Sequence, residues 1–329
     1  MVRHIIMRKR FICALRMSAP FRFQILHFYD RAGRICMRRD LHEANRLSWN
    51  AATRAHNSHK INQADFLRRG GSTLFPEEHM LLGDVRNLRI AHLQCNAGQD
   101  SLSLAALGAQ VTGVDISDEA IDFARHLSAE SGIPADFIRA DVYDWLEEEA
   151  STHPAAYDIV FSSYGFLCWL SDLEVWAGGI HAVLKPGGRF AAVEFHPFAL
   201  CLDQDWNLVY DYGGGIPLCE KNGVSDYVRL SGEALAPSGY RDGEECFHNP
   251  FPSHEYYHGL GDLINALAGA GFTLNSIREY PYANGWEPFA DMRHGEGEHA
   301  RRRYPPAMRK GRPFPSLPLM FSLDAKKST

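Results

Sequence analysis

The stretch from Leu88 to Ser117, LRIAHLQCNAGQDSLSLAALGAQVTGVDIS, predicts a strand, a tight turn, a helix and a second strand, followed by an acid. Ile90–Leu93 is a short apolar run with β character, and Gln94–Gly98 supplies a turn in which the backbone can approach a ligand closely. Ser101–Leu107 has the spacing of a helix, and Val111–Val114 is a second, β-branched run. This order is typical of a unit that binds a nucleotide or nucleoside.

An acid stands where such a unit places one. Asp115 follows the second strand, and in open α/β sheets an acid about twenty residues after the turn usually binds ribose hydroxyls. The turn itself has Gly98 as its only glycine, and the next glycine is Gly108. Because a pyrophosphate needs several small residues and a helix N-terminus, this spacing favours a nucleoside without phosphates.

Three later segments repeat the pattern in order. Phe137–Ala140 is a third predicted strand followed by Asp141, and Tyr157–Phe161 is a fourth. Leu184–Gly188, LKPGG, predicts a turn into a fifth strand, Arg189–Phe195. A parallel sheet of this kind would bring the ends of the strands, and the acids that follow them, to one edge.

On these residues the chain resembles the class I S-adenosylmethionine-dependent methyltransferases. The family's first motif has an acid and a G-x-G-x-G turn, which fall here on His92, Gln94, Asn96 and Gly98, so three of the four positions are substituted. The segment HLQCNAGQD resembles that of a subgroup of small-molecule methyltransferases, which carries HLQC in place of the usual motif.

The resemblance implies an α/β, Rossmann-like fold with a doubly wound seven-stranded sheet, mostly parallel with an antiparallel last strand. Thr273–Tyr280 and Leu317–Leu323 are the expected sixth and seventh strands. It also implies an N-terminal helical segment, and the long segment after the fifth strand predicts a β-rich lid insertion.

The same resemblance implies a site for S-adenosyl-L-methionine. The matching positions are Gln94, Cys95, Asn96, Gly98, Asp115, Ile116, Asp141, Val142, Ser162 and Ser163. Asp141 is expected to bind the adenine amino group, with Val142 beside the ring. Each acid could instead form a turn or cap a helix. The placement of both acids after successive strands favours contact with the cofactor.

The composition is that of an ordinary enzyme: 329 residues, of which 45% are hydrophobic and 22% charged, with a net charge of −6. This balance gives no reason to expect a nucleic-acid partner. The seven cysteines form no C-x-x-C pair, which favours reduced thiols in a cytoplasmic protein. The sequence contains no run of eighteen apolar residues, so no membrane span is predicted.

The chain divides into three parts. Residues 1–40 are rich in arginine and poor in acids, which is typical of a transit peptide and equally of an over-extended gene start, since Met17 and Met37 offer later starts; we expect them to be disordered. Residues 41–87 predict a helical cap. Residues 88–329 are the expected methyltransferase domain, with the lid at about 197–253.

Substrate contacts are expected from the cap and the lid. Asn50, His56 and Asn57 lie in a polar and aromatic part of the cap, where a substrate role and a solvated or capping role are both open. Within the lid, Asn207–Tyr212 and Val224–Leu230 are predicted strands.

Histidines and a tyrosine are the candidate catalytic groups. His196 follows the fifth strand, His258 precedes a predicted helix that begins near Leu260, and Tyr164 follows the fourth strand. Imidazole titrates near neutral pH, so either histidine could be a general base. Resemblance to 2-oxo-acid carbon methyltransferases also allows His196 and His258 to hold a divalent metal ion. The zinc-protease pattern H-E-x-x-H occurs at His254–His258, but it needs a helix, which the nearby prolines disfavour.

Three functions therefore compete: methyl transfer to a small-molecule acceptor through carbon, oxygen or nitrogen; an NAD(P)-dependent oxidoreduction; and non-catalytic binding of a nucleoside. The missing glycines and the LKPGG strand favour the first. The oligomeric state cannot be predicted from these features.

Overall fold

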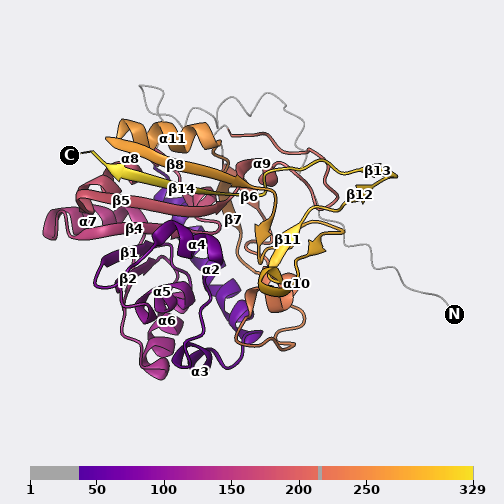
Figure 1. Cartoon of the computed structure of the whole chain (residues 1–329), viewed down its shortest axis with the longest axis horizontal. Helices are drawn as coiled ribbons and strands as arrows, with labels where there is room; N and C mark the ends of the chain where they lie inside the picture. The colour runs from indigo at the N-terminus through magenta and orange to yellow at the C-terminus, as the bar shows by residue number, and fades with distance from the viewer. Residues whose placement is uncertain (1–36, 214–216, 329) are drawn as a thin grey trace. The chain divides into compact units, whose positions relative to one another are not determined.

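The structure is a computed structural model that describes residues 37–213 and 217–328. The predicted N-terminal extension falls almost entirely outside the described residues. The main sheet has seven strands in the order β3-β2-β1-β4-β5-β14-β8 (Figure 1). Their bounds are β1 (Arg89–Leu93), β2 (Gln110–Asp115), β3 (Asp136–Arg139), β4 (Tyr157–Ser163), β5 (Leu184–Phe195), β8 (Phe272–Tyr280) and β14 (Met320–Lys327).

Strand directions confirm the predicted doubly wound sheet. β1, β2, β3, β4 and β5 pair in parallel with their neighbours. β14 runs antiparallel to both β5 and β8. Because chain order reverses between β1 and β4, a crevice for a ligand is expected outside the carboxyl ends of these two strands.

Helices cover both faces of this sheet (Figure 1). They are α5 (Gln99–Ala106), α6 (Asp118–Ser131), α7 (Val142–Thr152), α8 (Leu173–Val183) and α11 (Leu260–Gly269). Ala91 and Leu93 of β1 pack in one apolar cluster with α7, α8 and α11, whereas Ile90 packs in a second cluster with α5. The strand is apolar throughout because both of its faces are buried.

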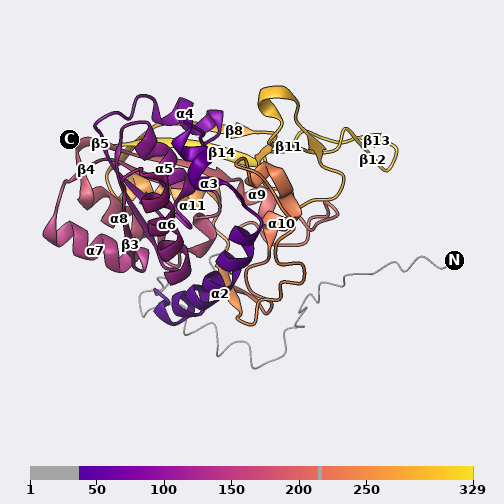
Figure 2. The ribbon, with the colours of Figure 1, turned by 90° about the horizontal axis from the view of Figure 1, so that it is seen from below.

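Three helices precede the sheet: α2 (Arg39–Ser58), α3 (Gln63–Arg68) and α4 (Pro76–Leu82). α2 contacts α6, β7 and α10, and Figure 2 shows it running between α6 and the segment that carries α10. The helical cap predicted at residues 41–87 is therefore helical in the structure, and α2 lies against the first turn of α6.

The segments after β5 and β8 add short elements. They are α9 (Pro197–Leu200), β6 (Pro217–Glu220), α10 (Tyr227–Ser231), β7 (Ser253–Tyr256), β9 (Ala283–Asn284), β10 (Arg293–His294), β11 (Arg302–Tyr304), β12 (Met308–Arg309) and β13 (Arg312–Pro313), with 3-10 turns η1 (Leu167–Trp169), η2 (Gly232–Leu235) and η3 (Gly297–His299). β6 pairs with β7, β11 joins β10 and β9, and β12 pairs with β13.

Both strands predicted inside the lid are wrong. Around Asn207–Tyr212, a single bridge joins Leu202 to Leu208 and the described chain is otherwise irregular. Val224–Leu230 leads into α10, because Asp226 accepts a hydrogen bond from the Arg229 amide and so caps a helix. Instead, β6 lies within the lid and pairs with β7, which begins at the lid's last residue, Ser253.

One other local prediction changed, and two agree with the structure. The LKPGG turn lies within β5 as an irregularity in its pairing with β4, and Gly187 there has φ +73°. The H-E-x-x-H residues begin in β7 rather than in a helix, so the two imidazoles are not spaced as the zinc-protease motif requires. α11 begins at Leu260, as predicted. None of the helices in the described ranges is both long and apolar enough to span a membrane.

Candidate active site

The turn after β1 keeps a glycine-type backbone without most of its glycines. Gln94, Asn96 and Gly98 have φ values of +54°, +50° and +76°. These are the three positions of the expected G-x-G-x-G motif. The Asn96 amide donates to Asp115 Oδ2 over 2.8 Å, which ties the turn to the end of β2. The substituted motif thus retains the left-handed conformation that glycine favours.

Gln94 has a contact that glycine could not make. Its Nε2 donates to the Phe166 carbonyl over 3.0 Å, so the turn after β1 holds the loop after β4. Within the described chain, Gln94 Oε1 and the Ser162 hydroxyl are buried without a hydrogen-bond partner. These two oxygens lie at the ends of β1 and β4, where a ligand with donor groups could satisfy them. Cys95, between Gln94 and Asn96, packs in an apolar cluster with Phe137.

Glu194 holds the same loop from β5. It is 2% exposed, and it accepts hydrogen bonds from the backbone amides of Gly165, Leu167 and Phe195. Burial raises its pKa to about 7, against the lowering effect of these amides. Glu194 was not predicted as a site residue, because the amides of Gly165 and Leu167 that it binds lie far from it in the sequence.

Asp115 lies at the end of β2 and is engaged at both oxygens. Oδ1 accepts the Ser117 amide and Oδ2 accepts the Asn96 amide, each over 2.8 Å. Burial raises its pKa to about 6. Asp115 therefore does stabilise the local turns. A carboxylate oxygen can still accept a second hydrogen bond, for example from a ribose hydroxyl. The neighbouring Ile116 is half-buried.

Asp141 is likewise a cap with a second partner. Oδ1 accepts the Tyr143 amide at the start of α7, and Oδ2 lies 2.7 Å from His42 Nδ1. His42 Nε2 lies 2.8 Å from the hydroxyl of the buried Ser171. Although burial opposes ionisation, the hydrogen bond and charge of His42 lower the Asp141 pKa. Val142, the first residue of α7, is 8% exposed.

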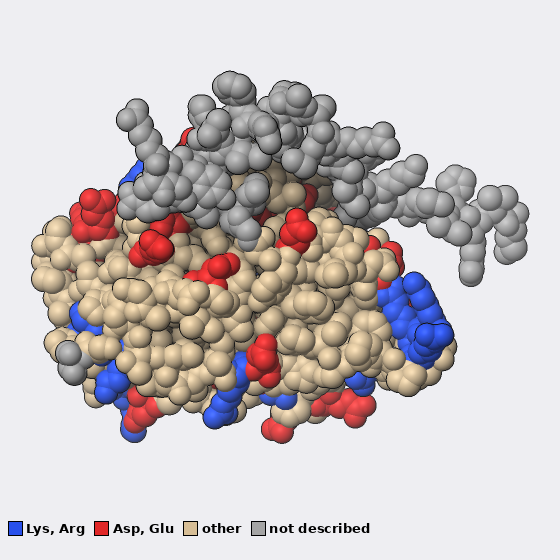
Figure 3. All heavy atoms as spheres, turned by 90° about the horizontal axis from the view of Figure 1, so that it is seen from above, with Lys and Arg blue, Asp and Glu red and all other residues tan. Residues whose placement is uncertain are grey.

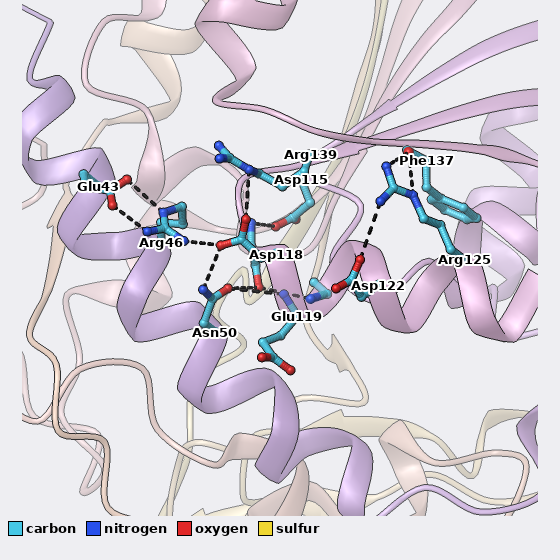
Figure 4. Close-up of polar contacts among 12 residues, drawn as sticks. Glu43, Arg46, Asn50, Asp115, Asp118, Glu119, Asp122, Arg125, Phe137 and Arg139 are labelled. Carbon is cyan, nitrogen blue, oxygen red and sulfur yellow. Dashed lines mark hydrogen bonds and ion pairs between the residues drawn. The ribbon is translucent and has the colours of Figure 1, made fainter.

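The predicted substrate residues of α2 are held by the protein. Asn50 accepts the Ser117 hydroxyl and donates to Asp118 at the start of α6 (Figure 4). Asn57 Oδ1 accepts Gln99 Nε2 over 3.0 Å. Asn50 thus contacts the residues that follow Asp115, and Asn57 contacts the first residue of α5.

His56 lies in an aromatic cluster. Its Nε2 is 2.9 Å from the Ser225 carbonyl, and its ring centroid is 4.1 Å from that of Tyr227. Trp49 packs edge-on against His56, Tyr227 and Trp169. Burial lowers the His56 pKa to about 4, and its Nδ1 has no partner in the part of the chain that the structure describes. A neutral imidazole here could accept a hydrogen bond from a ligand.

The two candidate catalytic histidines have different partners. His196 caps α9 through Nδ1, and its Nε2 lies 2.8 Å from Glu279 of β8, two strands away from β5. His258 Nε2 lies 2.6 Å from the Leu170 carbonyl. Across residues 37–213 and 217–328, no group of three or more metal-ligating side chains is present. The prediction of a shared metal at His196 and His258 therefore lacks structural support, because each ring has a separate partner.

Ser163 is the last residue of β4, and Tyr164 follows it directly. The Ser163 hydroxyl lies 3.4 Å from His92 Nε2, and His92 Nδ1 lies 2.8 Å from the Ser101 hydroxyl. Tyr164 has φ +41°, which is unusual for a bulky side chain. Its hydroxyl accepts a hydrogen bond from Asn284 over 2.9 Å. Backbone strain of this kind is frequent at functional sites.

Two cavities are lined by residues other than those at these strand ends. One, of about 510 Å³, lies between α3 and α6, and none of the predicted site residues lines it. The other, of about 240 Å³, is lined by residues of α4 and of the segment Glu298–Arg302.

Comparison with known proteins agrees with this geometry. A family profile described as a methyltransferase domain matches residues 90–188. The chain is 36% identical over 109 residues to the S-adenosyl-L-methionine-dependent Diels-Alderase iccD of Talaromyces variabilis, covering 32% of this chain and 36% of that protein. It is 33% identical over 106 residues to the ubiquinone biosynthesis O-methyltransferase of Bordetella pertussis, covering 32% and 42%.

The chain thus spans less than half the length of either curated relative. Among solved structures, a putative S-adenosylmethionine-dependent methyltransferase from Listeria monocytogenes is 18% identical with a TM-score of 0.48, covering 77% of this chain and 97% of that one. The matched segment, residues 90–188, contains the substituted turn and both strand-end acids. Residues 90–188 are therefore similar to a methyltransferase domain, and the curated relatives matched over this part of the chain are named as S-adenosylmethionine-dependent or methyl-transferring enzymes.

Proposed function

We propose that the protein transfers the methyl group of S-adenosylmethionine to a small-molecule acceptor. The observation that carries this proposal is the turn after β1, in which Gln94, Asn96 and Gly98 keep positive φ and Asn96 donates to Asp115. The family match over residues 90–188 includes this turn.

The residues present fit the donor. Asp115 would hold the ribose, and Asp141 with Val142 would hold the adenine. The unsatisfied oxygens of Gln94 and Ser162 would accept hydrogen bonds from the methionine part. Because the donor's sulfonium is already a good leaving group, the protein's own task is to align the acceptor, exclude water and remove a proton.

A small acceptor agrees with the charge of the chain. The net charge is −6, and in Figure 3 Lys and Arg gather most densely where Figure 1 draws β12 and β13, whereas Asp and Glu are scattered over the rest of that face. A protein that binds nucleic acid usually presents a broader basic surface. The buried thiols of Cys95 and Cys201, which form no disulfide, support a cytoplasmic setting.

A second candidate follows from the relative named as a Diels-Alderase. A chain of this fold could bind the donor and promote a cycloaddition without consuming it. The two candidates differ in one product, since only methyl transfer releases S-adenosylhomocysteine.

Calorimetry with S-adenosylmethionine, S-adenosylhomocysteine and NADH is the first test. We expect the first two to bind and NADH not to bind. Binding of NADH alone would replace this proposal with the oxidoreductase.

The second test uses donor labelled in its methyl group, with and without a chelator. Protocatechuate, phenylpyruvate and benzylamine probe oxygen, carbon and nitrogen acceptors. A labelled product with one of them supports methyl transfer. Donor binding without S-adenosylhomocysteine from these probes or from a metabolite extract would favour the cycloaddition or a non-catalytic protein.

A further inference from the structure

Two consecutive carboxyl groups are buried at the start of α4. Glu77 and Glu78 are 2% and 0% exposed. They face different partners. Glu77 accepts hydrogen bonds from the Tyr282 hydroxyl and Asn284 Nδ2, each over 2.8 Å, and pairs with Arg302. Glu78 accepts the Phe75 amide at Oε2 over 2.9 Å. Its Oε1 has no well-aligned hydrogen bond from any residue that the structure describes.

Because their partners differ, the pKa values of Glu77 and Glu78 are shifted in opposite directions. Burial opposes ionisation of Glu77, but the hydrogen bonds from Asn284 and Tyr282 and the charge of Arg302 lower its pKa. Burial raises the pKa of Glu78 to about 8. At neutral pH one carboxyl is therefore charged and the other carries a proton. Adjacent carboxyls driven apart in this way are a frequent arrangement of catalytic acids and bases.

Tyr164 joins this pair to the end of β4. Its hydroxyl accepts from Asn284 Nδ2, the same nitrogen that donates to Glu77. The hydroxyl also lies beside Glu78, which contributes to raising the Tyr164 pKa after the larger effect of burial. Tyr164 immediately follows Ser163 and is partly exposed, whereas Glu78 is fully enclosed. Tyr164 therefore links the end of β4 to the enclosed carboxyl of Glu78.

Titratable groups from three other segments of the chain interact with Glu78. Asp100 of α5 raises its pKa further, and Tyr164 lowers it. Arg301, which precedes β11, stacks over the Phe75 ring at 3.8 Å and interacts with both Glu78 and Tyr164. Arg301 is therefore placed to stabilise the negative charge that appears when Glu78 loses its proton.

We propose that Tyr164 and Glu78 together remove the acceptor's proton, an inference that rests on the proposed methyl transfer. The acceptor atom forms a bond to the methyl carbon as the carbon–sulfur bond breaks, and that bond's electron pair stays on sulfur. The acceptor's proton passes to the Tyr164 oxygen while the Tyr164 hydroxyl proton passes to Oε1 of ionised Glu78. Glu78 ends neutral and later releases the proton to solvent. Tyr164 is the catalytic residue in this scheme, and Glu78 acts through it.

The pH profile of methyl transfer tests the scheme, measured with whichever probe acceptor is methylated. In the wild-type protein the rate should rise with pH through about 8 as Glu78 ionises. Glu78→Gln should lower the rate on the order of 100-fold and remove that rise. Glu78→Asp should restore part of both. Tyr164→Phe should lower the rate similarly, since the relay has lost its hydroxyl.

Glu77→Gln is the matched control. It removes the neighbouring charge and should weaken the fold, but the rise in rate with pH should remain. Equal rates and profiles in Glu78→Gln and wild type would overturn the scheme while leaving methyl transfer intact. If the wild type methylates no acceptor, the proposed function fails first and the scheme fails with it.

Thermal unfolding gives a readout that does not depend on activity. The folded pKa of Glu78, about 8, lies above the ordinary value of 4.5. Its contribution to stability is therefore fully present below pH 4.5 and is lost as pH rises through 8. The difference in Tm between wild type and Glu78→Gln should change over this window. A difference that is constant with pH would show that Glu78 is already ionised and would overturn the scheme.

Discussion

The strand core and its cover are held together by different interactions. The core, residues 89–195, packs apolar side chains against both faces of the sheet. The cover, residues 39–82 and 197–315, is held by buried polar contacts between distant segments. Asn249 donates to the Ser48 carbonyl over 3.0 Å, and His59 lies 2.8 Å from Asp226. Losing one member of such a pair leaves the other buried and unsatisfied, so single changes in the cover should be costly.

Glu77→Ala should have the largest effect on stability. It would leave Arg302 without its carboxylate and Asn284 without one of its acceptors. Breaking a buried ion pair costs about 3–5 kcal/mol. Urea unfolding would measure this loss, with Glu298→Ala as the control because the Glu298 side chain is 86% exposed. Equal stabilities of the two variants would show that the cover does not depend on this pair.

Asp115→Asn tests the core's part of the site through binding. Losing a hydrogen bond to a charged group costs about 2 kcal/mol, or roughly a 30-fold loss of affinity for S-adenosylhomocysteine. Asp118→Asn, three residues on, is the control, because Asp118 pairs with Arg46 and Arg139 (Figure 4). Wild-type affinity should also fall below pH 6, where Asp115 becomes protonated. Similar affinities in the two variants would place the ribose elsewhere.

The core could be predicted because its signals are local. Ile90–Leu93, Val111–Val114 and Phe137–Ala140 match observed strands to within one or two residues. A short apolar run that is buried on both faces predicts a strand whatever the rest of the chain contains. The doubly wound, mostly parallel sheet with an antiparallel last strand then followed from the family resemblance.

The cover could not be predicted because its partners are distant. Val224–Leu230 has β-branched residues, but the Asp226 cap and the contact of Asn249 with the Val224 carbonyl favour another structure. Glu78 and Glu194 were missed for the same reason. Glu194 binds amides about 27 to 29 residues before it, and Tyr164 lies 86 positions beyond Glu78.

His42→Ala removes a contact between cover and core. It leaves Asp141 and Ser171 without their shared partner, at a cost of about 1–2 kcal/mol. Because Asp141 would lose its orientation, affinity for S-adenosylhomocysteine should fall about threefold, less than in Asp115→Asn. His126→Ala on exposed α6 surface is the control, measured by the same calorimetry and urea unfolding. An affinity unchanged from wild type would show that α2 only covers the adenine acid and does not position it.

The smallest effect is expected at Asn96, where the core departs furthest from the glycine motif. Asn96 has φ +50° and contributes to the site through its backbone amide, which any residue but proline supplies. Asn96→Gly loses the side-chain hydrogen bond to the Ala97 amide but adopts this conformation freely, so its stability should stay near that of wild type. Asn96→Ala loses the same bond and also pays for the left-handed conformation, by about 1 kcal/mol.

Urea unfolding of the two Asn96 variants would compare them directly, because they differ only in a Cβ. S-adenosylhomocysteine affinity should be unchanged in Asn96→Gly, since the amide still binds Asp115. If alanine were as stable as glycine, the turn would not require a left-handed residue, and the retained glycine-type backbone could no longer support the donor site. If Asn96→Gly also kept full affinity, replacing the motif's glycines would have changed the sequence of this turn without changing its backbone conformation. The turn after β1 would then tolerate substitution of a side chain. The buried polar pairs of the cover, in contrast, are expected not to tolerate the loss of a member.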